Sequence, residues 1–169
     1  TLNSPADGYT MLFSTANGFT ITPLLSKKLP YDPERDFAPV TLVATAPLLA
    51  AVHPSLPVNS IKELISFAKA RPKQLFYASN GNGSIQHLAT EMLSQAAGIA
   101  MVHVPYNGGT PAVFSTVSGQ VQLVITAIPT VLSQVRASRL RALAVTGAKR
   151  SSAIPDLPTV AESGLPGFE

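Results

Sequence analysis

The sequence predicts an α/β protein in which a parallel-dominated sheet is flanked by helices. From about residue 60 onward, short apolar runs alternate with longer amphipathic segments, and the links between them are short. Gly98 and Gly119 stand where helix C-caps belong, and Thr110-Pro111 has the N-cap-plus-proline pattern of a helix start. Strict alternation of strand and helix is typical of a parallel sheet wrapped by helices.

The composition is that of a compact globular protein. Of 169 residues, 46% are hydrophobic and only 12% are charged, which excludes a disordered chain. The net charge is +3, but the basic residues are scattered and lack interleaved aromatics, so we predict no nucleic-acid partner. The absence of cysteine excludes disulfides and thiolate chemistry. Because the chain does not begin with Met, we expect it to be a segment of a longer protein.

The first 59 residues show no regular alternation. Residues 9–14 have the composition of a strand, and residues 21–27 of a short helix. Two prolines make residues 29–33 an extended loop. Residues 40–52 are mostly apolar, and we expect one long strand that bends at Pro47 and passes from one sheet to another.

The regular part starts with the capping box Ser60-Ile-Lys-Glu63, which predicts a helix as far as about Ala70. The elements that follow are strands at 75–78, 101–104, 121–126 and 140–146, and helices at 84–97, 110–118 and 129–137. The tail after residue 148 is proline-rich, with one short helix expected at 159–163.

The most informative segment is the loop 79–84, which opens the helix 84–97. Gly81 and Gly83 allow the backbone to approach a ligand closely, and Ser84 is a good N-cap. Helix N-termini attract anions through unpaired amides and the helix dipole. Since the loop carries no charged residue, it indicates binding rather than catalysis. P-loop and dinucleotide motifs fit poorly, and such loops also occur without any ligand.

Three successive strands end in small, neutral, hydrogen-bonding loops. In a parallel sheet, ligands sit beyond the carboxyl ends of the strands. We therefore expect a half-pocket for a small carboxylate. The residues expected to contact the ligand are Ser79, Asn80, Gly81, Gly83, Ser84, His87, Tyr106, Asn107, Gly108, Thr110, Thr126 and Ala127.

An enzymatic alternative would use Ser84, His87 and Glu91, which share one helix face. Side chains on a single helix rarely form the directed hydrogen bonds of a hydrolytic triad. We therefore expect His87 to pack beside the sheet and Glu91 to be solvated or paired. His53 and His103 have no Asp, Glu or Cys at ligand spacing, so we predict no metal site, and no cofactor is expected.

Six motifs occur in a fixed order along the chain. They are Pro5-Ala-Asp-Gly-Tyr-Thr10, Leu29-Pro-Tyr-Asp-Pro33 with Asp36-Phe-Ala-Pro-Val40, Ser79-Asn-Gly-Asn-Gly-Ser-Ile-Gln-His-Leu88, Val104-Pro-Tyr-Asn-Gly-Gly-Thr-Pro-Ala112, Leu140-Arg-Ala-Leu-Ala-Val-Thr146 and Leu157-Pro-Thr-Val-Ala-Glu-Ser-Gly-Leu-Pro-Gly-Phe-Glu169. As a set they resemble the Bug family, the TctC-like extracytoplasmic solute receptors of tripartite tricarboxylate transporters. The resemblance covers essentially the whole chain.

The resemblance implies a type II periplasmic-binding-protein-like fold and a periplasmic receptor, not an enzyme. Two lobes would close on a small di- or tricarboxylate or a related organic acid and deliver it to a membrane permease. Residues 1–45 would be part of the first lobe, residues 46–148 the complete second lobe, and residues 149–169 a return segment to the first. A truncated first lobe would leave strand 9–14 unpaired, so we expect this segment either to be disordered or to be covered by another copy of the chain through strand addition or swapping.

The chain departs from the family pattern at three positions. Members usually carry Lys or Arg where this chain has Asn107, and commonly Asp in place of Ser115 and Thr126. The match over loop 79–84 and His87 is nearly complete. The ligand is therefore left open, as is the possibility of a sensor or orphan receptor that has no dedicated permease.

Overall fold

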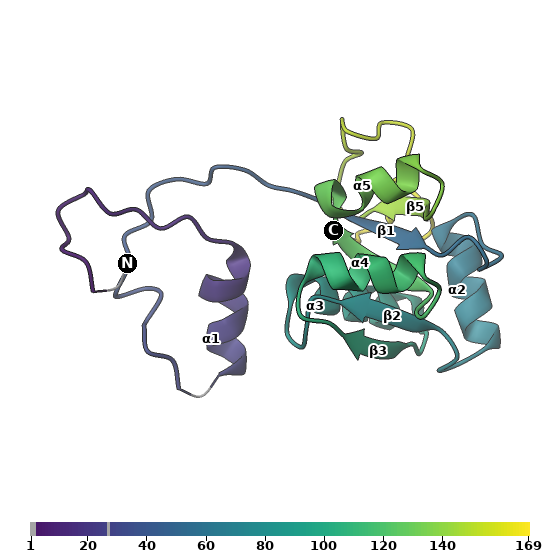
Figure 1. Cartoon of the computed structure of the whole chain (residues 1–169), viewed down its shortest axis with the longest axis horizontal. Coiled ribbons are helices and arrows are strands. Elements are labelled where there is room, and N and C mark those ends of the chain that lie inside the picture. Colours follow the sequence, from purple (N-terminus) through teal and green to yellow (C-terminus); the bar gives the residue numbers. More distant parts are fainter. Residues whose placement is uncertain (1–2, 27) are drawn as a thin grey trace. The chain divides into compact units, whose positions relative to one another are not determined.

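The computed structural model describes residues 3–26 and 28–169. The chain separates into two compact units, Thr1–Thr45 and Ala46–Glu169. Figure 1 shows the helices and strands of both. The last residue of the helix expected at 21–27 lies outside the described residues.

The second unit is built on one five-stranded sheet in the order β3-β2-β4-β1-β5. The strands are β1 (Leu48–Val52), β2 (Phe76–Ser79), β3 (Val102–Pro105), β4 (Leu123–Ala127) and β5 (Arg141–Val145). Strand β2 pairs in parallel with β3 and β4, whereas β1 is antiparallel to β4 and β5. Four strands therefore run in one direction and β1 opposes them, which makes the sheet mixed rather than strictly parallel.

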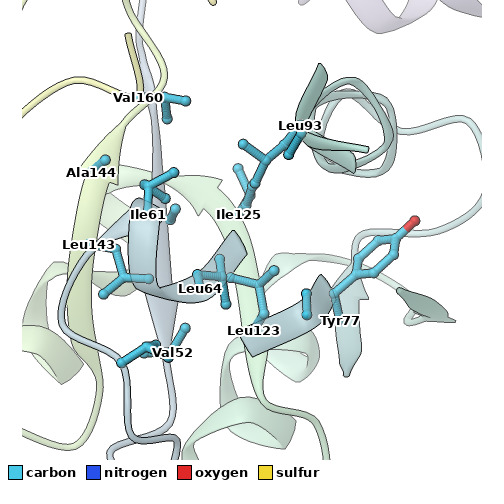
Figure 2. Packing of buried hydrophobic residues seen from close by; sticks show 14 of the residues in the cluster. Val52, Ile61, Leu64, Tyr77, Leu93, Leu123, Ile125, Leu143, Ala144 and Val160 are labelled. Atoms are coloured by element: carbon cyan, nitrogen blue, oxygen red, sulfur yellow. The ribbon is translucent and has the colours of Figure 1, made fainter. Parts of the chain in front are cut away.

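Four helices cover the two faces of this sheet: α2 (Ile61–Ala70), α3 (Ile85–Ala97), α4 (Gly109–Val117) and α5 (Ile128–Arg136). Helices α2 and α3 pack on one face, where Tyr77 joins a buried cluster (Figure 2). Helices α4 and α5 pack on the other face, where Ala78 is buried. Neighbouring residues of β2 thus enter different cores, as the period of two in a strand requires.

The local signals in the sequence act as expected in this unit. The Ser60 hydroxyl accepts a hydrogen bond from the Glu63 amide at 3.2 Å, and α2 begins at the next residue. Gly98 ends α3 with a φ of +62°. The expected helices and strands of residues 61–146 are confirmed, with boundaries that differ by up to two residues.

Two predicted strands in the first part of the chain are wrong. Residues 9–14 form no strand, and the long strand expected at 40–52 is reduced to β1, which starts just after Pro47. A strand needs a partner for its backbone groups, and neither 9–14 nor 40–46 has one among the described residues. Among the described residues there is one sheet, and β1 is the only strand of it before β2 (Phe76–Ser79).

The tail forms a turn at residues 160–164 instead of a helix. Thr159 makes a parallel bridge to Val145 at the end of β5. Val160 is fully buried and Phe168 is 9% exposed, both in the cluster on the α2 and α3 face. The tail thus belongs to the compact unit of residues 46–169. The assignment of 1–45, 46–148 and 149–169 to lobes stays a prediction.

The first unit contains little regular structure. A π-helical turn (Asn17–Ile21) continues into α1 (Thr22–Leu25). The rings of Phe19, Tyr31 and Phe37 pack with centroid separations of 5.1–6.4 Å. Asp32 and Asp36 accept backbone hydrogen bonds from their own turn, so a local turn role accounts for both.

Two segments of the first unit expose large apolar side chains. Tyr9, Met11 and Phe13 are 92%, 79% and 80% exposed, and Val40 and Leu42 are 83% and 79% exposed. Both segments combine unpaired backbone with apolar side chains, which are the properties of an aggregating strand edge.

We expect the 169-residue chain to self-associate through these segments. Light scattering should give a concentration-dependent mass above the 17.7 kDa of one chain. Lysine at Phe13 and Leu42 should shift the mass towards the monomer, because charges oppose strand addition. Lysines at the exposed Thr20 and Ser26 are the matched control and should leave the mass unchanged. A wild-type chain that is monomeric at every concentration contradicts this expectation.

Candidate functional site

Three neighbouring strands of the second unit deliver their ends to one edge of the sheet. Because β2 lies between β3 and β4 and is parallel to both, Ser79, Pro105 and Ala127 end at the same edge. The segments that follow β2, β3 and β4 come close together at Gly109, the first residue of α4. A Cβ added at Gly109 would lie 3.4 Å from the Asn80 amide atoms and 3.4 Å from Thr130 Cγ2.

The loop 79–84 is closed by its own hydrogen bonds. Ser79 Oγ accepts from the Gly81 amide at 3.1 Å, and Ser84 Oγ donates to the Gly81 carbonyl at 2.8 Å. Ser84 Oγ also accepts from the His87 amide at 3.2 Å, which is the N-cap bond of α3. Both serines are buried. Their hydroxyls thus shape the loop, which leaves backbone amides as its free donors.

The N-terminus of α3 offers two such amides. The Ser84 amide bonds to the Gly81 carbonyl and the His87 amide is capped, but those of Ile85 and Gln86 have no acceptor among the described residues. These are the first two positions of the helix, where the dipole is positive. No Lys, Arg, Asp or Glu lies in residues 79–84. The loop therefore offers hydrogen-bond donors that carry no formal charge, at the positive end of the α3 helix dipole.

The N-terminus of α4 lies next to this loop and, unlike that of α3, has no side-chain cap. The Tyr106 amide donates to the Ser79 carbonyl at 3.0 Å. Gly108 is the N-cap residue with a φ of +112° and no side chain to cap the helix. The amides of Gly109 and Thr110 have no acceptor within the described chain. Two positive helix ends thus share one edge of the sheet.

The remaining predicted residues take different positions around this edge. Asn107 and Thr110 are exposed, and Gly108 is half-buried. The Tyr106 hydroxyl contacts Ser115 Oγ, so this ring is fixed from α4. Thr126, in β4, is 1% exposed, and Ala127 is the N-cap residue of α5. The structure brings the three loops together, while contact of these residues with a ligand stays a prediction.

A stack of three rings lies against the loop. The His87 and His103 rings are 4.0 Å apart and inclined by only 13°, and His103 stacks on Tyr77 at 5.0 Å. His87 Nδ1 accepts from the Gly83 amide at 3.1 Å. His103 Nε2 is 2.6 Å from Ser79 Oγ. Each histidine therefore holds one end of the loop.

His103 was absent from the expected contact set, because a strand histidine without Asp, Glu or Cys at ligand spacing indicates neither a metal site nor a catalytic role. The signal lay in the register, since Tyr77 and His103 are directly paired on adjacent parallel strands. Thr130 was also left out of the expected contact set. Thr130 lies in α5 and approaches Gly109 at the start of α4. This proximity depends on how the two helices pack, which the local sequence does not display.

Burial and neighbouring charge set the protonation of the stack. Burial lowers the pKa of His103, the nearby His87 lowers it further, and Glu91 acts in the opposite direction. Burial also raises the pKa of the Tyr77 phenol, and its hydrogen bond to Glu91 adds to this effect. Two unit charges 4 Å apart near a protein surface repel by about 4 kcal/mol. A proton on His87 therefore disfavours a proton on His103.

The predicted alternative triad does not form. Ser84 Oγ contacts the backbone amide of His87, not its imidazole. The His87 Nδ1 atom is occupied by the Gly83 amide, and Glu91 bonds to the Tyr77 hydroxyl. His87 packs beside the sheet and Glu91 is paired, as expected. A serine hydrolase mechanism has no support from this geometry.

Two surface pockets lie away from the ends of β2, β3 and β4. One of about 470 Å³ is lined by Met92, Gln95 and the tail residues 165–169. A second, of about 350 Å³, lies between α2, α3 and the same tail. Neither contains a residue of the predicted set.

Comparison with known proteins identifies the family. The sequence model of the tripartite tricarboxylate transporter family receptor, TctC, matches residues 2–169. BugT of Bordetella pertussis is 39% identical over 169 residues, which are 99% of this chain and 52% of BugT. A UPF0065 protein from a tcbD-tcbE intergenic region of a Pseudomonas species is 38% identical over 98% of this chain and 49% of its own.

Solved structures of similar proteins agree with the fold. Rpa4515 of R. palustris, solved with adipate, superposes with a TM-score of 0.92 at 40% identity, covering 99% of this chain and 56% of that one. MatC of Rhodopseudomonas palustris, with bound malate, has a TM-score of 0.77 at 28% identity, covering 91% and 50%. The periplasmic binding protein BugD has a TM-score of 0.83 at 35% identity, covering 90% and 51%.

The chain spans about half the length of the curated relatives it matches. Within residues 3–26 and 28–169, no helix has the length and apolar character needed to cross a membrane. The family match covers nearly the whole chain, as the ordered motifs predicted. The chain therefore belongs to the tripartite tricarboxylate transporter receptor family, TctC.

Proposed function

We propose that this chain supplies one wall of a receptor site for a small carboxylate. The observation that carries the proposal is that two uncharged helix N-termini, those of α3 and α4, lie at one edge of the sheet and each keeps unpaired first-turn amides. Their unpaired amides suit an anion because each N–H can donate and both dipoles point their positive ends at it. A carboxylate has two oxygens, and each can accept from one of these helix ends.

The family match and two ligand-bound neighbours support this class of ligand. Rpa4515 was solved with adipate and MatC with malate, both of which are small dicarboxylates. In our proposal the loop 79–84 and the start of α4 hold one carboxylate through backbone amides. Asn80, Tyr106, Asn107, Thr126 and their neighbours line the space beside it.

We further propose that the first lobe of the full-length receptor closes over this edge and completes the site. One open wall cannot exclude water, and charge-assisted hydrogen bonds are strongest where water is excluded. In this proposal residues 46–148 are the complete second lobe, and residues 1–45 and 149–169 contribute to the first. In the periplasm, the closed form would hold the ligand and deliver it to a membrane permease.

The proposed receptor releases its ligand unchanged. An enzyme with Ser84, His87 and Glu91 would convert it, but these three side chains form other hydrogen bonds. The neutral character of the loop supports capture, since it offers donors for a carboxylate and no charged acid or base among residues 79–84.

Changing Gly83 tests the loop. With a φ of +72°, Gly83 adopts a conformation that β-branched residues rarely reach, so Gly83→Val should displace the first amides of α3. In the full-length receptor, calorimetry should show adipate binding at least about tenfold weaker, or about 1.4 kcal/mol. The control is Gly164→Val, which imposes the same strain at a φ of +112° in the tail. Unchanged affinity in Gly83→Val rules out the loop as a ligand contact.

Changing Asn107 and Thr126 tests what sets ligand choice. A neutral side chain can donate a hydrogen bond but cannot form an ion pair with an ionised distal group, so these two positions should shape selectivity more than affinity. Asn107→Lys should re-rank a ligand panel towards diacids, and Thr126→Asp towards ligands with a cationic group. Ser118→Lys, at the far end of α4, adds the same charge away from the edge and should keep the wild-type ranking. An identical ranking in all variants would place both positions outside the site.

A further inference from the structure

The two stacked histidines contact the proposed carboxylate loop at its two ends. His103 reaches Ser79, the first residue of the loop, and His87 reaches Gly83, directly before the N-cap of α3. We propose that His87 and His103 are positioning residues that hold the loop in its binding shape, and that the loop is released when His87 takes up a proton. This inference rests on the proposed function for its effect on binding.

The hydrogen bond to Gly83 fixes the tautomer of His87. An amide N–H can only donate, so Nδ1 must be the unprotonated nitrogen and the neutral ring carries its proton on Nε2. A second proton would have to enter at Nδ1. It would replace the acceptor of Gly83 with a donor, so the 3.1 Å contact would be lost.

Loss of the contact between the Gly83 amide and His87 would affect the N-terminus of α3. Gly83 stands at a φ of +72° and precedes Ser84, whose amide and hydroxyl both bond to the Gly81 carbonyl. With the Gly83 amide released, the backbone that aims the free amides of Ile85 and Gln86 loses one of its restraints. The carboxylate would then meet a loop that must be ordered on binding, at a cost in affinity.

His103 differs because its partner is a hydroxyl. Ser79 Oγ can donate to a neutral Nε2 or accept from a protonated one, so this contact survives either state. Its effect on the switch comes through the stack: a proton on one ring opposes a proton on the other at 4.0 Å. The other titratable groups around the pair are Tyr77 on β2 and Glu91 on α3, which bond to each other. Residues 79–84 contribute none.

For His103, burial and the nearby His87 lower the pKa, whereas the carboxylate of Glu91 raises it. The geometry at Gly83 makes the loop sensitive to a proton on His87 Nδ1. Because the charge of a histidine generally changes between about pH 5 and 8, the proposal predicts a loop that loosens as the pH falls through this range. Ligand capture should therefore be weaker at pH 6.0 than at pH 7.5.

The first arm of the test uses the full-length receptor without ligand. Nitrogen-15 NMR should find neutral His87 protonated on Nε2, and the Gly83 amide signal should move together with the titration of His87. In His87→Asn, an amide oxygen can replace Nδ1 as the acceptor but does not titrate, so the Gly83 signal should be flat between pH 7.5 and 6.0. His53→Asn is the matched control, because His53 follows β1 at the opposite edge, and it should keep the wild-type titration.

The second arm measures adipate affinity of the same three proteins at pH 7.5 and 6.0 by calorimetry. Wild type and His53→Asn should bind at least threefold more weakly at pH 6.0, whereas His87→Asn should bind equally at both values. A Gly83 signal that ignores the His87 titration, or one pH profile shared by wild type and His87→Asn, overturns the inference. If no protein binds adipate at either pH, the proposed carboxylate function has failed for this ligand, and the first arm still decides whether His87 controls the loop.

Discussion

The parallel pairing of β2 with both β3 and β4 is the constraint on which the candidate site depends. It places three strand ends at one edge, so that α3, α4 and α5 all begin there. The same pairing sets Tyr77 beside His103, and thereby brings His103 under the loop 79–84. A shift of one residue in this register would turn the side chain of Ser79 to the other face of the sheet and separate it from His103.

The loop 79–84 presents a candidate anion site that contains no charged side chain. Its two serine hydroxyls satisfy groups of the loop itself, and two glycines take backbone conformations closed to most residues. The amides left over are those at the start of α3, next to those of α4. Since an amide cannot change its charge with pH, such a site depends on geometry, and the histidine stack is the part of that geometry that can titrate.

In residues 61–146, where the strands have their pairing partners, most helices and strands could be predicted from local sequence signals. Ser60, Ser84 and Gly98 mark helix ends through side-chain oxygens or a left-handed φ, and these are short-range properties that a sequence displays. Residues 9–14 failed because strand formation needs a partner, and a β-like composition does not supply one. Likewise β1 proved antiparallel, because strand direction depends on where the chain re-enters the sheet rather than on the strand's own residues.

The convergence of the loops was predictable from alternation of strands and helices, but its details were not. Contact between Asn80, Gly109 and Thr130 depends on the approach of three elements, and no spacing within one segment encodes it. The role of His103 depends on register between strands more than twenty residues apart in the chain. The family resemblance pointed to the loop motif itself, but it left the hydrogen bonds of each side chain open.

The most direct test of the account is amide chemical-shift mapping of the full-length receptor as adipate is added, beside its uncharged diamide of the same length. The account predicts saturable shifts concentrated at the amides of Ile85, Gln86, Gly109 and Thr110 with adipate, and none of comparable size with the diamide. Shifts confined to the hollow lined by Met92 and residues 165–169, or equal shifts with both compounds, would contradict the assignment of a carboxylate site to the ends of β2 and β3.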